Sequence, residues 1–299
     1  MKKIIYTTII LIVLVTILSC FIGCKGKDIE VSDDLASNKG DIVNDLSAYT
    51  LASTAYNNWK NNVFPNHLRT EHFTFSVNEG KMATRQARQI YKVDNGNIWS
   101  EQVTINSGLA GANYAVKLLY NASTETGYAH VLNGNKKVLG EEPDIYAISD
   151  WGTPDTYTMQ ENSEEIEKFK TDYKKMITTY NLDSFEYLDD THDDTVYTYA
   201  PDPTKYLCTV TIDMSLEAQK TVQKIAKAEF ENALGAKEDS IDMEPVTITF
   251  LVEKVDDTYR VLQWVSREVY TGYKVGTQSC AQSYKATFSY NEEDYKIEM

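Results

Sequence analysis

The stretch that decides the fold runs from Arg85 to Ile105 and reads RQARQIYKVDNGNIWSEQVTI. Two runs rich in Val, Ile and aromatic residues, Arg85 to Val93 and Ile98 to Ile105, flank the sequence Asp94-Asn95-Gly96-Asn97. Asn and Gly tolerate the positive φ angles that a tight hairpin turn requires. The stretch therefore predicts two antiparallel β-strands joined by a short turn.

Similar runs continue on both sides of this hairpin. His72 to Val77 precedes it, and Asn113 to Tyr120 and Gly127 to Leu132 follow it, with further turn sequences between them. These runs predict an antiparallel meander. Six later segments have the same composition and are also expected to be strands: Phe185 to Leu188, Val196 to Tyr199, Tyr206 to Ile212, Val246 to Val255, Tyr259 to Tyr270 and Tyr284 to Tyr290.

Three segments instead show the three- and four-residue spacing of apolar side chains that is typical of amphipathic helices. The first runs from Asp41 to Asn62, the second opens at Asn162 with a capping-box Glu165, and the third runs from Ser215 to Gly235. The order of elements predicts an α+β protein: a large curved antiparallel β-sheet with about three helices packed on its concave face.

The N-terminus predicts export. Lys2 and Lys3 precede the mainly apolar run from Ile4 to Leu18, as in a secretory signal peptide. Gly23 directly before Cys24 resembles the lipobox of bacterial lipoproteins, in which such a cysteine is acylated and becomes the mature N-terminus. Residues 1–23 are then a lipoprotein signal peptide, and Cys20 is the competing lipidation site. The alternative is an uncleaved membrane anchor over residues 4–23, because about 20 apolar residues span a bilayer.

Both alternatives place the rest of the chain outside the cytoplasm, held to the bacterial membrane at its N-terminus. Residues 24–40 are polar and are expected to form the lipidated N-terminus and a flexible tether, followed by a single domain over residues 41–299. The 29 Lys and Arg against 44 Asp and Glu give a net charge of −15, which excludes nucleic-acid binding by long-range attraction. We expect a monomer.

Two cysteines remain in the expected domain. Cys208 lies in an expected strand and Cys280 in a connection rich in small polar residues. In an exported protein they form either a disulfide or two separate reduced thiols. The sequence leaves both alternatives open, because a disulfide needs Cα atoms within about 7 Å of each other.

The order of elements resembles that of the LolA-like carriers, the mycobacterial LppX/LprG-like lipoproteins and their uncharacterised relatives in Gram-positive bacteria. The local matches are Tyr128 to Lys137 (YAHVLNGNKK), Val255 to Leu262 (VDDTYRVL) and Ala286 to Asn291 (ATFSYN). The resemblance implies a half-barrel whose concave sheet encloses an apolar cavity for acyl chains. It assigns no ligand-binding residue, because these families bind through cavity shape.

The search for catalytic and metal motifs is negative. No nucleophile elbow, Walker loop or dinucleotide fingerprint occurs, and the sequence predicts no enzyme and no cofactor. His67, Glu71 and His72 approximate a zinc motif, but histidines five apart lie about 140° apart around a helix. We expect them at a strand start or on the surface. The acidic run Asp189 to Asp194 offers oxygen ligands for Ca²⁺ or is a solvated loop, and we favour the loop because no Gly supplies the sharp turn.

Aromatic residues are the remaining signal, with 21 Tyr, 9 Phe and 4 Trp. Those on expected strands line a cavity or pack in an ordinary core: Trp99, Tyr114, Tyr128, Phe250, Trp264 and Tyr284. The expected function is therefore a lipid-anchored protein of the extracytoplasmic membrane face that binds or carries a lipid or another hydrophobic ligand. The alternative is a cell-envelope interaction or adhesion protein with a filled core that binds protein or glycan partners.

Overall fold

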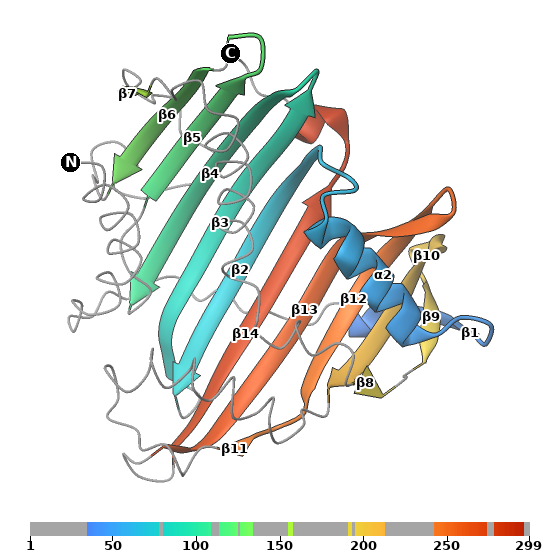
Figure 1. The fold of residues 1–299 in the computed structure, drawn as a ribbon. Coiled ribbons are helices and arrows are strands. Elements are labelled where there is room, and N and C mark those ends of the chain that lie inside the picture. The colour runs from blue at the N-terminus through green and yellow to red at the C-terminus, as the bar shows by residue number, and fades with distance from the viewer. Residues whose placement is uncertain are drawn as a thin grey trace.

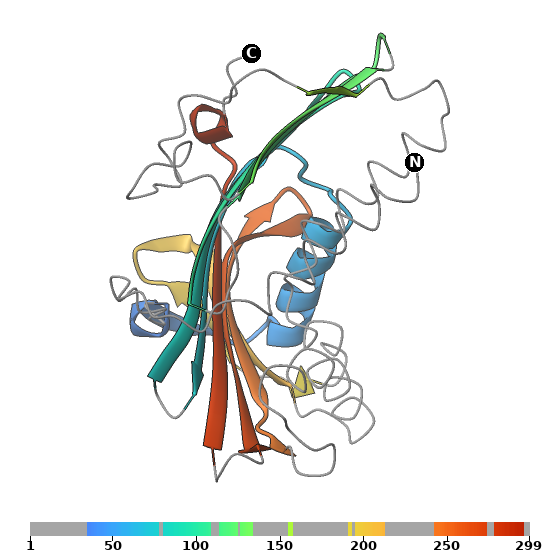
Figure 2. The same cartoon turned by 90° about the vertical axis from the view of Figure 1, so that its left-hand side faces the viewer.

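A computed structural model describes residues 35–77, 80–108, 114–124, 126–133, 155–157, 191–192, 195–212, 242–273 and 278–295. The strands in these ranges form one 14-stranded antiparallel sheet, which is open and not closed into a barrel (Figure 1). Seen edge-on, the sheet is curved, and α2 (Ala48–Lys60) lies against its concave face (Figure 2).

The large curved sheet agrees with the sequence prediction, but the three expected helices are not confirmed. The described residues contain one α-helix. The expected helices from Asn162 and from Ser215, and the expected strand from Phe185 to Leu188, lie outside the described residues.

The sheet joins strands in the order β1-β9-β10-β12-β13-β14-β2-β3-β4-β5-β6-β7, with β8 beside β10 and β11 beside β13. Two short 3-10 helices, η1 (Ala36–Asn38) and η4 (Glu292–Tyr295), flank the described chain. The strands are β1 (Lys39–Val43), β2 (His67–Val77), β3 (Gly80–Asp94), β4 (Asn97–Gly108), β5 (Tyr114–Asn121), β6 (Thr126–Asn133), β7 (Asp155–Tyr157), β8 (Thr191–His192), β9 (Val196–Tyr199), β10 (Asp202–Ile212), β11 (Asp242–Met243), β12 (Val246–Val255), β13 (Thr258–Tyr273) and β14 (Gln278–Ser289).

The meander from β2 to β6 forms as the turn sequences predict. In the β3–β4 hairpin, Asp94 pairs with Asn97, and the two turn residues Asn95 and Gly96 have φ angles of 49° and 81°. Positive φ at both central positions is the backbone geometry of a type I′ turn, which matches the right-handed twist of the flanking strands. The turn residues therefore fix the register of this hairpin.

Long-range pairing places the C-terminal strand in the middle of the sheet. β14 pairs with β2 from Cys280 to Ser289, so that Phe288 lies opposite Arg69 and Tyr284 lies opposite Phe73. This pairing joins the N-terminal meander to the later strands.

The first expected helix is shorter than the sequence predicted. Ser47 caps α2, its hydroxyl accepting a hydrogen bond from the Thr50 amide at 3.1 Å. The first residues of the expected helix form β1 instead, because β1 pairs with β9 and the Asp41 amide donates to the Thr198 hydroxyl at 2.9 Å. Pairing with another strand overrode the local helical pattern.

The expected tether over residues 24–40 also ends earlier than predicted. Leu35 is only 3% exposed and packs with Leu207, Leu251 and Val265 on the convex face of the sheet. The folded domain therefore begins at or before Leu35, because this side chain is already part of a hydrophobic cluster.

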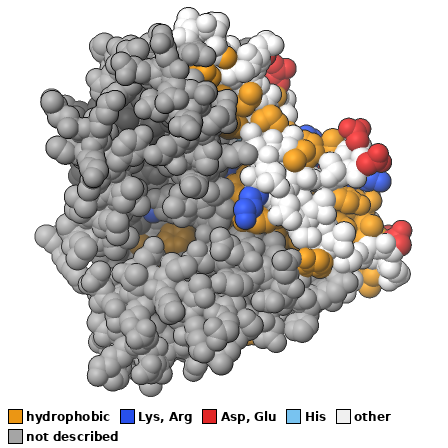
Figure 3. All heavy atoms as spheres, viewed as in Figure 1, with side chains coloured by type: hydrophobic (Ala, Val, Ile, Leu, Met, Phe, Trp, Pro, Cys, Tyr) orange, Lys and Arg blue, Asp and Glu red, His pale blue; other side chains and the backbone are white. Residues whose placement is uncertain are grey.

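The main core lies between α2 and the concave face. α2 packs mainly on β10, β12 and β13 and buries its apolar stripe against their inward side chains. In the space-filling view of this side, hydrophobic and polar side chains of the described residues are interspersed (Figure 3). Among those residues the exposed large hydrophobic side chains are Ile42 and Val63.

Candidate functional site

A buried polar cluster lies on the concave face where β2 meets β14. Arg69 is 0% exposed, and its Nη2 lies 2.6 Å from Glu71 Oε1. The same nitrogen donates a hydrogen bond to the Tyr284 hydroxyl at 2.5 Å. The strands build this cluster: Arg69 and Glu71 are two apart on β2 and so share a face, and Tyr284 reaches them from β14.

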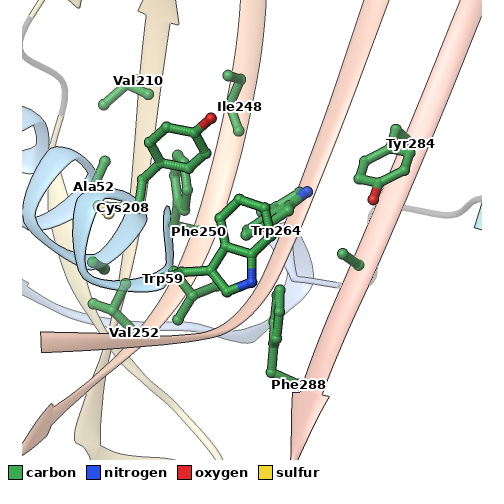
Figure 4. Packing of buried hydrophobic residues seen from close by; sticks show 14 of the residues in the cluster. Ala52, Trp59, Cys208, Val210, Ile248, Phe250, Val252, Trp264, Tyr284 and Phe288 are labelled. Carbon is green, nitrogen blue, oxygen red and sulfur yellow. The ribbon is translucent and has the colours of Figure 1, made fainter. Parts of the chain in front are cut away.

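Aromatic rings surround the Arg69 guanidinium. Its carbon lies 4.8 Å from the ring centroid of Trp59, 5.5 Å from that of Trp264 and 5.7 Å from that of Phe288. Trp59 lies on α2, so that an aromatic side chain of the helix covers the charged Arg69 side chain of the sheet. Figure 4 shows Trp59 beside Trp264, with Phe288 and Tyr284 carried by the neighbouring strand. Cation–π attraction in this desolvated setting stabilises the charged guanidinium.

The protonation states in the cluster follow from burial and neighbouring charge. Burial opposes the charge of Arg69, but the Glu71 carboxylate and Tyr284 outweigh it and raise the pKa of Arg69. Burial raises the pKa of Tyr284, so that it stays a neutral phenol. The cluster is therefore an ion pair with one neutral hydroxyl partner, and the described geometry provides no nucleophile beside a general base.

His67 lies next to this cluster at the start of β2. It is 3% exposed, its Nδ1 lies 3.3 Å from the Phe64 carbonyl oxygen, and its Nε2 has no hydrogen-bond partner among the described residues. Burial, and secondarily the charge of Arg69, lower its pKa to about 4. His67 is therefore neutral near pH 7.

The structure separates the residues of the approximate zinc motif. His67 and His72 differ by an odd number of positions on β2 and so point to opposite faces of the sheet. His67 agrees with the expected strand-start role, but it is buried and not on the surface. In the part of the chain that is described, no group of three or more His, Cys, Asp or Glu side chains is arranged to hold a metal ion.

The two cysteines of the domain lie on strands that are three apart in the sheet. Cys208 on β10 faces Phe250, whereas Cys280 on β14 pairs with Tyr270 and Val77. Three strand spacings are about 14 Å, and the two residues are also offset along the strands. This distance corrects the disulfide alternative, because a disulfide requires Cα atoms within about 7 Å.

The expected aromatic residues fall into two groups. Phe250, Trp264 and Tyr284 converge in the core beneath α2, whereas Trp99 lies on the convex face beside Lys92. Tyr114 and Tyr128 belong to β5 and β6, and their side chains lie outside the described residues. The described residues also exclude Cys20, Cys24 and all of the acidic run from Asp189 to Asp194 except Thr191 and His192.

Sequence reasoning missed Arg69 and Phe288 as members of the site. The available signal was the alternation of side chains along the strand. Arg69 lies on the same face as Glu71, Phe73 and Phe75, and the two phenylalanines indicate that this face points inward. A charge at an inward position indicates a buried ion pair. Its partner Tyr284 depended on the β14–β2 pairing.

No helix in the described ranges is long and apolar enough to cross a membrane. No family model matches the chain, and no curated protein matches it. Among solved structures, it is similar to an N-terminal dehydratase from the difficidin assembly line, with 10% identity, 81% of this chain and 85% of the other covered, and a TM-score of 0.12. A second is the dehydratase domain of the CurJ module of curacin polyketide synthase, with 8% identity, 88% and 89% covered, and a TM-score of 0.11. Scores this low carry no inference about fold or activity.

Proposed function

We propose that this chain is an exported, lipid-anchored binding protein that holds a lipid or another amphiphile against the concave face of its sheet. The observation that carries the proposal is the difference between the two faces of the central strands. On β2 the inward positions beyond the Arg69–Glu71 pair include Phe73 and Phe75, whereas the outward positions include Thr74 and Ser76. On β14 the inward Tyr284 and Phe288 alternate with the outward Lys285.

The aromatic residues of the concave face extend beyond the strands on which α2 mainly packs, and of these Phe75 is 6% exposed while Phe73 is partly buried. α2 packs mainly on β10, β12 and β13, whereas Phe73 and Phe75 belong to β2. An apolar sheet face of this extent suits the acyl part of an amphiphile, because apolar pockets are lined by such side chains. The open curved sheet is also consistent with the resemblance to half-barrel lipoproteins. In this proposal the protein is a carrier and no enzyme.

The test compares charges placed on opposite faces of one strand. The chain over residues 25–299, which lacks the expected lipidation site Cys24 and retains Leu35 and β1, is purified from a bacterial host and weighed by native mass spectrometry. Phe73→Lys places a charge on the concave face, and Thr74→Lys is the matched control on the convex face. We expect added mass that resolves into a defined lipid, and uptake of a fluorescent fatty acid that falls at least tenfold in Phe73→Lys alone.

A second candidate function is a cell-envelope interaction protein with a filled core. The dense packing around Trp264 favours it, because its ring centroid lies 5.1 Å from that of Trp59 and 4.9 Å from that of Phe288. A clean apo mass with no uptake of acyl probes would reject the carrier and support this alternative.

The lipid anchor has its own test. Cells that express the full chain are fed labelled palmitate, and the chain is isolated. We expect label in the unchanged chain and in Cys20→Ser, and none in Cys24→Ser. Label that survives Cys24→Ser and disappears in Cys20→Ser would move the lipidation site to Cys20.

A further inference from the structure

A hollow of about 420 Å³ opens on the convex side, where β12, β13 and β14 approach their ends. Leu251 and Leu262 in its lining belong to the convex hydrophobic cluster, which places it on the face opposite to α2. A register shift lies beside it: Leu251 pairs with Gln263 and Val252 pairs with Val261, so that Leu262 is an extra residue in β13. Such bulges bend a strand and re-aim its side chains.

The charges around the hollow are neutralised in pairs. Arg260 Nη2 lies 2.6 Å from Glu253 Oε2, and Lys205 Nζ lies 3.0 Å from Asp202 Oδ2. The guanidinium of Arg260 also lies 4.4 Å from the ring centroid of Tyr290. A charged ligand would have to compete with these partners. The hollow therefore favours a ligand without net charge.

The hollow also presents groups that suit a hydroxyl-rich ligand. Gln263 lines the hollow, but its Nε2 has almost no accessible surface and no hydrogen-bond partner among the described residues, so that the side chain must rotate before a ligand reaches this amide. Thr287 and Asn291 line the same space, and Leu251 and Leu262 contribute apolar residues to its lining. An unsatisfied buried amide is unfavourable until an acceptor reaches it. Sugars supply both an acceptor for the amide and an apolar surface for the leucines, because they carry hydroxyls around their rim and C–H groups on their faces.

We propose that this hollow binds a neutral hexose or N-acetylhexosamine unit of a glycan. Its volume is in the range of small-molecule sites, which is about 300 to 1,000 Å³. Leu251 contributes both to the hollow and to the cluster that holds Leu35, so the hollow lies beside the N-terminal end of the folded domain. This site is separate from the concave face and does not depend on the proposed carrier function.

The experiment titrates the full chain, reconstituted in phosphatidylcholine nanodiscs, with maltose, cellobiose and N,N′-diacetylchitobiose by calorimetry. Gln263→Leu removes the buried amide and Thr287→Val removes a hydroxyl from the lining. Thr74→Val, on the convex face of β2 outside the hollow, is the matched control. We expect at least one disaccharide to bind, at least tenfold weaker binding in Gln263→Leu, weaker binding in Thr287→Val and unchanged affinity in Thr74→Val.

Two results would overturn the proposal: no disaccharide binds the unchanged chain, or binding keeps its affinity in both hollow variants. If Gln263→Leu does not fold, as judged by circular dichroism, Thr287→Val decides alone. Nanodiscs that contain a glucosyl lipid identify the source of the bound sugar. If the hollow takes a sugar that a membrane lipid carries, the glucosyl lipid weakens the apparent affinity for the free disaccharide. Uptake of fatty acid by Gln263→Leu remains normal, which separates this site from the carrier proposal.

Discussion

Arg69 on β2 lies beneath the indole ring of Trp59 on α2, with 4.8 Å between the guanidinium carbon and the ring centroid. The contact joins the helix to a strand on which it does not mainly pack. The guanidinium is also paired with Glu71 on β2. This buried ion pair therefore lies between the part of the concave face that α2 covers and the neighbouring part that β2 forms.

Breaking the buried ion pair will destabilise the fold. Arg69→Met leaves the Glu71 carboxylate buried without its cation, which costs about 3–5 kcal/mol. The free energy of unfolding in urea, followed by tryptophan fluorescence, measures the loss. The double variant Arg69→Met with Glu71→Leu removes both charges and should lose less than Arg69→Met alone. An equal or larger loss in the double variant would contradict a role as a charge pair.

Trp264 is the largest fully buried side chain of the described core. Trp264→Ala removes its contacts with Trp59 and Phe288 and leaves a cavity, which costs about 3–5 kcal/mol. Thr247→Ala, at an exposed position of the neighbouring β12, is the control and should change stability by less than about 0.5 kcal/mol. If Trp264→Ala lowered the free energy of unfolding by less than about 1 kcal/mol, this region would not be closely packed.

Gly96 is required in the β3–β4 turn for two reasons. Its φ angle is 81°, and a Cβ built there would lie 3.1 Å from the Cβ of Ala122. We expect Gly96→Ala to lower the free energy of unfolding by about 1 kcal/mol or more. Asn95→Gly is the control, because glycine readily adopts the φ angle of 49° at that position. Equal thermal stability of Gly96→Ala and the unchanged chain would count against this turn geometry.

His67 makes the stability of the fold depend on pH. Its pKa is lowered to about 4 in the folded chain, from 6.5. Between these values the unfolded chain binds a proton that the folded chain does not, so stability falls as pH falls from about 6.5 to about 4. The contribution is about 3 kcal/mol by the conversion of pKa shifts into free energy.

The test measures urea unfolding at pH 7.0 and at pH 4.5 in the unchanged chain and in His67→Phe. We expect a smaller difference between the two pH values in His67→Phe, because this variant has no imidazole to protonate. His72 has a lowered pKa as well, chiefly through burial, so part of the dependence remains in the variant. An identical pH dependence in both proteins would exclude His67 as its source.

Local patterns predicted the strands well. Val196–Tyr199 and Val246–Val255 form strands with the expected bounds, and the Asp94 to Asn97 turn forms the expected hairpin. Alternation and turn residues are properties of a few neighbouring positions, so they can be recognised without the rest of the chain. The first helix was predicted too long, because its expected N-terminal part instead pairs with β9. The hydrogen bond between Asp41 and Thr198 joins these segments across 157 residues of sequence.

The candidate site was predicted only in part. Trp264 and Tyr284 were recognised as aromatic residues of expected strands, and Trp59 lies within the expected first helix, but their convergence around Arg69 depends on which strands are neighbours. The convex hollow was not predicted, because its lining residues come from β10, β12, β13 and β14, and the sequence does not reveal that these strands are neighbours.

The sequence by itself determined the kinds of element, the turn positions and the alternation of the two sheet faces, since these follow from side-chain chemistry over short distances. Only the tertiary structure decided that β14 lies between β13 and β2, and this pairing brings Tyr284 and Phe288 to Arg69. The physical reason is that strand pairing uses backbone hydrogen bonds common to all residues, so that burial across the whole sheet selects the partner.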